Sequence, residues 1–287
     1  MKQFEFYRFL LTPLTEPELP LSPKSKKEII EEIFEKGKIH YFYVHGKKYA
    51  LRVKLETQGY VYAHLGKQSK KDIIKSPEEG FEKQEHEDWS GCKIFVNTNN
   101  EKNSGKTETA GQIIAIEINN KDIKNRDNVL QKFSSKINRE ISKYNFFLSI
   151  NKIPSEKTNF WNIAKKHEGK IKKVVFTYTP PNLFNLETEL EKDLEEANRT
   201  YNVTKTQIAF ENSEGALILP EDNPLLKQSV KYAELGNASF SIHLTGKKKT
   251  ISSEDKIKTK TLKETNISID GNISEEELVN IIHDLMV

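Results

Sequence analysis

The feature that most constrains this fold is a run of period-two alternation that begins at Ile39. Side chains alternate from Ile39 to Val44, a tight turn follows at His45-Gly46-Lys47, and the alternation resumes from Tyr49 to Leu55. This period is typical of a strand with one buried face, and two such runs around a glycine-containing turn predict a hairpin. Gly59 permits a second turn before the run Tyr60 to Leu65. The chain is therefore expected to build an antiparallel sheet of aromatic-rich strands.

The rest of the N-terminal half predicts further strands and two amphipathic helices. Ser25 followed by Glu28 resembles a capping box and predicts a helix that ends at Gly37. Apolar residues recur every four positions over Asn125 to Lys143, which predicts a second helix. The polar stretch Ser76 to Ser90 is expected to interrupt the sheet. Other strands are predicted at Gln3–Leu11, Cys92–Val96, Gln112–Ile118 and Tyr144–Ile150.

The length of 287 residues suits about two domains, and Pro154 marks the expected boundary. We expect an α+β protein. Its first domain (1–153) would hold an aromatic-rich antiparallel sheet with amphipathic helices, and its second (154–287) would be a mixed α/β domain that carries basic clusters. Strands and helices are predicted in the second domain at 158–167 (helix), 172–179 (strand), 183–198 (helix), 206–210 (strand), 223–235 (helix), 239–245 (strand), 266–269 (strand) and 274–285 (helix).

Composition excludes several classes of protein. The longest apolar runs, such as Ile113 to Ile116, fall far short of the ~20 residues needed to cross a bilayer. Charges at Glu5 and Arg8 interrupt the start of the chain, where a signal peptide would be apolar. The single cysteine, Cys92, excludes an internal disulfide and a multi-cysteine zinc site. We expect a cytoplasmic protein that does not insert into membranes.

Catalytic and cofactor motifs are weak. Gly105-Lys106-Thr107 matches the end of a phosphate-binding loop, but position 100, where the first glycine belongs, is Asn100. Four carboxylates and His86 lie within Glu82 to Asp88 and are the only candidate metal site, although consecutive side chains in a loop diverge. Cys92 begins an apolar strand and is interpreted as a buried small residue rather than a nucleophile. We expect no catalytic residue, metal or cofactor, while a site assembled from distant residues stays open.

The distribution of charge along the chain is more informative than the net charge of +3. Residues 151–173 carry seven lysines against two glutamates, and residues 246–264 carry seven lysines against three acids. Residues 187–196 oppose them with six acids and one lysine. Lysine neutralises phosphate but lacks the fork with which arginine reads a guanine edge, so these clusters predict contacts to a nucleic-acid backbone. The candidate binding residues are Lys165, Lys166, Lys170, Lys172, Lys173, Lys247, Lys248, Lys249, Lys258 and Lys260. A solvated surface in a lysine-rich chain is the alternative.

The hairpin carries a family resemblance. The run Tyr41-Phe42-Tyr43-Val44-His45-Gly46-Lys47, followed by an alternating strand, resembles the early hairpin of the RexA-type phage-exclusion proteins. The order that follows is also similar, with a Lys-Asp-Ile-Ile segment (Lys71 to Ile74), an acidic loop and two strands, so the resemblance covers residues 39–118. It implies a DNA-binding component of a prokaryotic antiviral system that acts with a partner effector. No catalytic residue comes with it.

Three functions remain open at this point. The first is a non-enzymatic nucleic-acid-binding or sensing subunit of a phage-defence system, which binds DNA through backbone contacts and acts with a second protein. The second is a metal-dependent, nuclease-like effector that uses the acids of Glu82 to Asp88. The third is a scaffold without nucleic-acid binding, in which the acidic helix of one copy docks on a basic patch of another to form a homo-oligomer.

Overall fold

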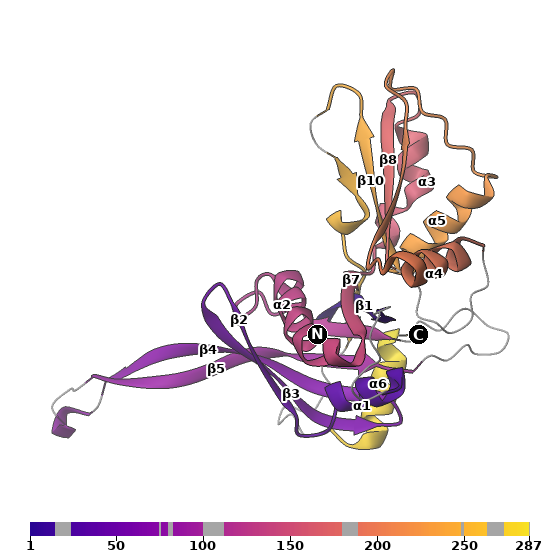
Figure 1. Cartoon of the computed structure of the whole chain (residues 1–287). Coiled ribbons are helices and arrows are strands. Elements are labelled where there is room, and N and C mark those ends of the chain that lie inside the picture. The colour runs from indigo at the N-terminus through magenta and orange to yellow at the C-terminus, as the bar shows by residue number, and fades with distance from the viewer. Residues whose placement is uncertain are drawn as a thin grey trace.

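The computed structural model describes residues 1–14, 24–74, 76–79, 83–99, 112–179, 189–247, 250–262 and 273–286. Over these residues the chain has a mixed α/β fold, with two antiparallel sheets and helices packed on both (Figure 1). The expected α+β class, with an antiparallel N-terminal sheet followed by a second mixed part, is confirmed.

The first sheet contains the meander predicted from the alternation. Its strands are β1 (Lys2–Pro13), β2 (Ile39–Val44), β3 (Lys47–Thr57), β4 (Tyr60–Ile74), β5 (Lys83–Asn97), β6 (Ile113–Glu117), β7 (Phe146–Lys152) and β12 (Thr259–Leu262). Their order is β12-β1-β6-β5-β4-β3-β2, and β7 also pairs with β1. Every pair is antiparallel. The turn between β3 and β4 places Gln58 and Gly59 at positive φ, which the glycine accommodates without strain.

Helices cover the two faces of this sheet unequally. The helices α1 (Lys26–Ile33) and α2 (Arg126–Ile141) pack on one face, where they share a core with β1 to β7. The predicted capping box at Ser25 is present. The other face is covered only in part, by α6 (Glu275–Met286), whose Leu278, Ile281 and Ile282 pack on the aromatic side chains of Phe4, Tyr62 and Phe95. We call this second side of the sheet the α6 face.

The second sheet has the order β11-β10-β8-β9, with strands β8 (Ile171–Tyr178), β9 (Thr206–Glu211), β10 (Ala238–Leu244) and β11 (Ile251–Ser252). The helices α3 (Phe160–Lys166), α4 (Glu189–Tyr201) and α5 (Pro224–Glu234) supply apolar residues to its core, which is separate from the two cores of the first sheet. The predicted strand at 266–269 lies outside the described residues.

The chain returns to the first sheet after β11. Residues of β12 pair antiparallel with the start of β1, from Lys2↔Leu262 to Glu5↔Thr259, and α6 then packs on β3, β4, β5 and β12. The expected second domain over 154–287 did not anticipate this return, because its boundary was placed from one proline and could not register a pairing between the two ends of the chain. Both β12 and α6 therefore pack on the first sheet.

The stretch expected to interrupt the sheet instead extends it. Strands β4 and β5 pair without a break from Tyr60↔Asn97 to Ile74↔Lys83, and beyond Lys67 they have no further neighbour in the described sheet. They project from the body as a two-stranded ribbon, which we call the arm (Figure 1). A cross-strand ion pair joins Lys70 to Glu85 at 2.8 Å within it. None of the arm side chains that the structure describes (68–70, 83 and 85–90) is buried, which is why the sequence carries no buried-and-exposed alternation there.

Candidate nucleic-acid interface

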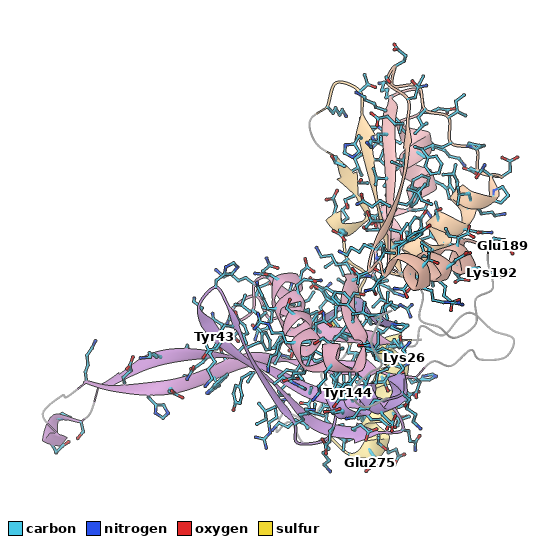
Figure 2. The ribbon with its side chains drawn as sticks, in the orientation of Figure 1. Lys26, Tyr43, Tyr144, Glu189, Lys192 and Glu275 are labelled. Carbon is cyan, nitrogen blue, oxygen red and sulfur yellow. The ribbon has the colours of Figure 1, made fainter. Side chains whose placement is uncertain are left out.

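The part of the α6 face that α6 leaves open carries the largest exposed aromatic side chains of the first sheet. Tyr41 is 48% exposed, Tyr43 63% and Trp89 41%. Tyr43 extends from the end of β2 close to the base of the arm (Figure 2). Large aromatic groups are normally buried in cores, so three of them on one open sheet surface indicate a binding surface.

Strand register brings these rings into two neighbouring rows. In the first row Tyr43 pairs with Lys48 on β3, and Trp89 on β5 pairs with Gln68 on β4. In the second row Tyr41 on β2 pairs with Ala50. Because successive side chains of a strand alternate between faces, all these residues face the same side of the sheet.

The floor of the surface between the rings is made of small residues. Ala50 pairs with Gly66, and Gly66 pairs with Gly91, so three neighbouring strands place almost no side chain there. A Cβ at Gly66 would lie 3.2 Å from Cε3 of Trp89, which shows that the indole rests against the glycine backbone. The result is a hollow of about 680 Å³ lined by residues of β2, β3, β4 and β5 together with Lys2, Glu117 and Asn119. We call it the aromatic hollow.

Cations surround the aromatic hollow. Lys48 lies between two of its rings, with Nζ 4.9 Å from the ring centre of Tyr41 and 6.0 Å from that of Trp89. A third row adds Arg52, which pairs with His64. The five cationic and two acidic side chains of its lining are Lys2, Lys48, Arg52, Lys54, Lys93, Glu87 and Glu117.

The charges of the hollow are not balanced internally. Glu117 is 7% exposed and receives Lys2 Nζ at 2.6 Å, so its charge is already engaged by a neighbour. Among the described residues, neither Arg52 nor Lys54 has a carboxylate within ion-pair distance. A surplus of cations beside polar backbone is the electrostatic requirement for a phosphate-binding surface.

Burial and nearby charges shift the pKa values of groups that line the hollow. Burial, followed by the charges of Lys54 and Lys93, holds the pKa of His64 below its ordinary value. Burial and, more weakly, Lys2 lower the pKa of Lys93, while Glu117 opposes that effect. The neutral His64 ring is hydrogen-bonded to the hydroxyl of Tyr62, whose pKa burial raises to about 12. Burial is the largest cause of both lowered pKa values, and at His64 the charges of Lys54 and Lys93 act in the same direction.

The lysines predicted from the sequence do not form one site. Lys166, Lys170 and Lys247 gather around His167 at one end of the second sheet, where their charges help to lower its pKa after burial. Lys165 is paired with Glu221 at 2.8 Å, and Lys173 with Glu211 at 2.9 Å. Lys172 lies exposed on β8. Lys258 and Lys260 belong to the first sheet, beside β1, and Lys248 and Lys249 lie outside the described residues.

The candidate catalytic and metal-binding residues find no shared site in the described part of the chain. No group of three histidine, cysteine or acidic side chains there could hold a metal ion. Of the acidic run, residues 83–88 lie on β5 in the arm, while Glu82 and the loop with Gly105-Lys106-Thr107 are outside the described residues. Cys92 is buried, and burial raises the pKa of its thiol, as expected for a core residue.

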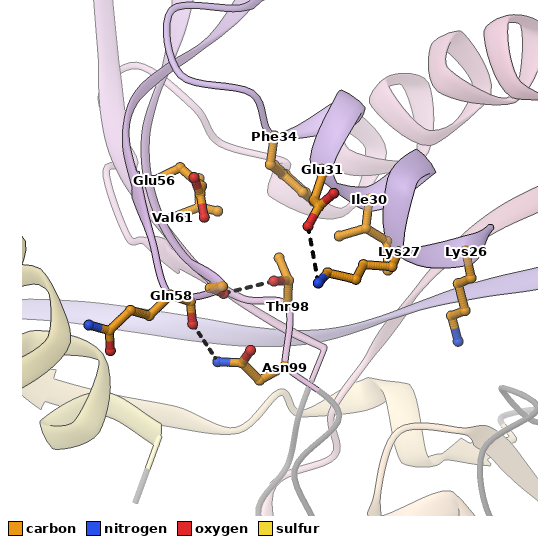
Figure 3. Close-up of a pocket in the computed structure, with 11 residues that line it drawn as sticks. Lys26, Lys27, Ile30, Glu31, Phe34, Glu56, Gln58, Val61, Thr98 and Asn99 are labelled. Carbon is orange, nitrogen blue, oxygen red and sulfur yellow. Dashed lines mark hydrogen bonds and ion pairs between the residues drawn. The ribbon is translucent and has the colours of Figure 1, made fainter. Parts of the chain in front are cut away.

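A second hollow lies between α1 and the turn that joins β3 to β4 (Figure 3). It holds about 500 Å³, and the ion pair between Lys27 and Glu31 stands at one side of it. Its opposite wall is tied together by hydrogen bonds, from Thr98 Oγ1 to the carbonyl of Gly59 at 2.8 Å and from Asn99 Nδ2 to the carbonyl of Gln58 at 2.9 Å. Lys26 and Glu56 also line this hollow, but its lining includes none of the exposed aromatic side chains, so it offers less for a nucleic-acid base than the aromatic hollow does.

Sequence reasoning missed the aromatic hollow although its signal was present. The alternation predicted that Ile39, Tyr41 and Tyr43 share one face of a strand, and that face carried aromatic side chains where a solvent-facing side usually carries polar ones. Trp89 lay in a segment expected to be a loop, so its approach to Tyr41 could not be foreseen.

The chain matches no protein-family model, no curated protein and no solved structure. Within its described residues, none of the helices combines the length and the apolar character that a membrane span requires.

Proposed function

We propose that this chain is a non-enzymatic nucleic-acid-binding subunit that binds its ligand in the aromatic hollow. One observation carries the proposal: three exposed aromatic rings and a surplus of cations share an open sheet face. Sheets that bind nucleic acid use this combination, in which cations neutralise phosphates and aromatic rings stack on bases. The hairpin that resembles the RexA-type proteins supplies Tyr41 and Tyr43, and on that resemblance we propose a role in prokaryotic antiviral defence together with a partner effector.

A salt-dependent binding assay tests the proposal. Fluorescence anisotropy is measured with labelled DNA and RNA oligonucleotides over a series of salt concentrations. The logarithm of the association constant should fall linearly with the logarithm of the salt concentration. The double variant Arg52→Glu/Lys54→Glu should weaken binding and reduce that slope by about 0.7–0.9 for each phosphate contact removed. Both side chains are exposed, so the fold should not depend on them.

The matched control is Lys121→Glu/Lys132→Glu, which changes the net charge equally at exposed positions that do not line the hollow. The variant Lys166→Glu/Lys170→Glu examines the cluster on the second sheet in the same way. If all three double variants weaken binding equally, attraction follows the total charge and the hollow is not the site. Absence of binding at low salt would remove the proposal altogether.

A further inference from the structure

We propose that the aromatic hollow selects single-stranded nucleic acid, with two or three unstacked bases on Tyr41 and Trp89 in its lining and Tyr43 beside it, and with their phosphates on the adjacent cations. This inference rests on the proposed function and deepens it, because nucleic-acid binding alone does not distinguish strands from duplexes. The geometry of the rings carries it.

The rings are spaced for separate bases. Tyr41 and Tyr43 lie two residues apart on one strand, which places their Cα atoms about 7 Å apart. Trp89 lies in the same row as Tyr43 but three strands away, a distance of about 14 Å across the sheet. These are backbone spacings; the Trp89 indole itself leans over Gly66, and beside it Ala50 and Gly91 add almost no side chain to the floor on which a planar group would lie. Sheet surfaces of this kind stack two or three bases.

Aromatic rings distinguish a strand from a duplex because they need the faces of bases. In a duplex each face is covered by the neighbouring base pair, and only base edges are open in the grooves. A base must be flipped out of a duplex before it can stack on a side chain, which requires unpairing it. In a single strand the faces are already accessible, so only a single strand obtains the stacking contribution of Tyr41, Tyr43 and Trp89.

The cations give the bound strand a direction across the surface. Lys48 lies between the Tyr41 and Trp89 rings. Arg52, His64 and Lys93 form the third row of the sheet face, which is the row nearer to α6. If bases stack on the rings near the arm, the phosphates of the same strand would therefore lie near the row of Arg52, His64 and Lys93. The helix α6 closes that end of the face, and the arm, which begins beyond Lys67, bounds the other.

The two tryptophans of the chain allow a direct test. Trp161 lies on α3, packs against the core of the second sheet and does not line the hollow, so the variant Trp161→Phe leaves Trp89 as the only indole. We expect titration with a 15-nucleotide oligo(dT) or oligo(U) to quench its fluorescence, and the reciprocal variant Trp89→Phe to show no quenching on the same titration. Base stacking on the indole is the cause of the difference.

Affinities complete the test. Trp89→Ala and Tyr43→Ala should each weaken binding of the 15-nucleotide strands about 5- to 150-fold and leave binding of a 15-base-pair duplex unchanged. The matched control is Tyr201→Ala, which removes an aromatic side chain that is 74% exposed on α4. Far-ultraviolet circular dichroism checks that each variant is folded.

The outcomes separate the two proposals. Selective loss of strand binding supports both. Duplex binding that equals strand binding, with ring variants that do not alter either, overturns the single-strand inference and leaves the proposed function in place. Failure of every oligonucleotide to bind at low salt overturns both.

Discussion

Two glycines that face each other in the floor of the aromatic hollow should respond to very different extents to the same added methyl group. Gly66 on β4 pairs with Gly91 on β5. A Cβ at Gly66 would meet the Trp89 side chain at 3.2 Å, whereas a Cβ at Gly91 would meet the carbonyl oxygen of Leu65 at 2.0 Å. A side chain can move away, but a carbonyl oxygen in a paired strand cannot move without separating the strands.

The magnitudes follow from these neighbours. Gly66→Ala gains about 0.4–1 kcal/mol from the reduced entropy of the unfolded chain and loses about 0.5–1.5 kcal/mol as Trp89 leaves its rotamer, so its net effect on the free energy of unfolding is within about 1 kcal/mol. Gly91→Ala carries an overpacking cost of about 1–3 kcal/mol and about 1 kcal/mol for each hydrogen bond lost between β4 and β5. We expect Gly91→Ala to be the less stable variant by about 2–3 kcal/mol.

Urea denaturation followed by far-ultraviolet circular dichroism measures this difference, which corresponds to about 1 M in the midpoint. A second readout concerns function: in the Trp161→Phe background, Gly66→Ala should shift the emission of Trp89 and weaken strand binding while the free energy of unfolding changes by no more than about 1 kcal/mol. Equal destabilisation by the two alanines would refute the packing argument, since they would then act through loss of glycine alone.

Three further perturbations have expected outcomes. Burial lowers the pKa of Lys26 to about 7, so the folded state binds fewer protons than the unfolded state between pH 7 and 10.5. The stability of the wild-type protein should therefore rise from pH 7 to 10. Lys26→Met should raise the free energy of unfolding at pH 7 by at most about 4 kcal/mol and abolish that rise, as measured by urea titrations. Burial also lowers the pKa of His40, whose Nε2 lies 2.8 Å from the carbonyl oxygen of Ile33. Because the unfolded state then binds the proton more tightly, stability should fall as the pH falls below about 6.5. His40→Asn should flatten that pH dependence in thermal melts. Glu5 accepts two hydrogen bonds from Arg126, at 2.7 and 2.8 Å. Glu5→Gln should lower the free energy of unfolding by about 3 kcal/mol, because it leaves a largely buried guanidinium without its counter-charge. Glu5→Asp is the milder comparison in the same denaturation assay.

How much of this fold the sequence could predict depended on whether a segment buries one face. The meander from Ile39 to Leu65 and the helix over Asn125 to Lys143 bury one side of each element, so their apolar periods of two and about 3.6 were visible, and β2, β3, β4 and α2 lie where those periods placed them. The second sheet was readable for the same reason, because β8 and β10 alternate buried and half-buried residues.

Neither the arm nor the pairing of β12 with β1 could be predicted from the sequence, and each failure has a physical reason. None of the described side chains of the arm is buried, so no apolar period marks it, and pairs such as Lys70↔Glu87 are recognised only after the register is known. The pairing of β12 with β1 joins residues more than 250 positions apart, and a four-residue strand carries too few side chains to indicate its partner. The candidate site failed to emerge for the same reason, since Tyr41 and Trp89 are neighbours only through β3 and β4.

The aromatic hollow also explains why one half of the α6 face is covered and the other is open. Under α6 the sheet presents Phe4, Tyr62 and Phe95, which are at most 1% exposed, and burying such rings stabilises the fold. Beyond α6 the same face presents Tyr41 and Trp89 around a glycine floor, although covering them with another apolar helix turn would stabilise the fold by the same means. The cations between these rings, above all Lys48, would make that cover costly because a helix would strip water from a charge without supplying an anion. A ligand that is both planar and anionic satisfies the rings and the cations together, and a nucleic acid strand has both properties.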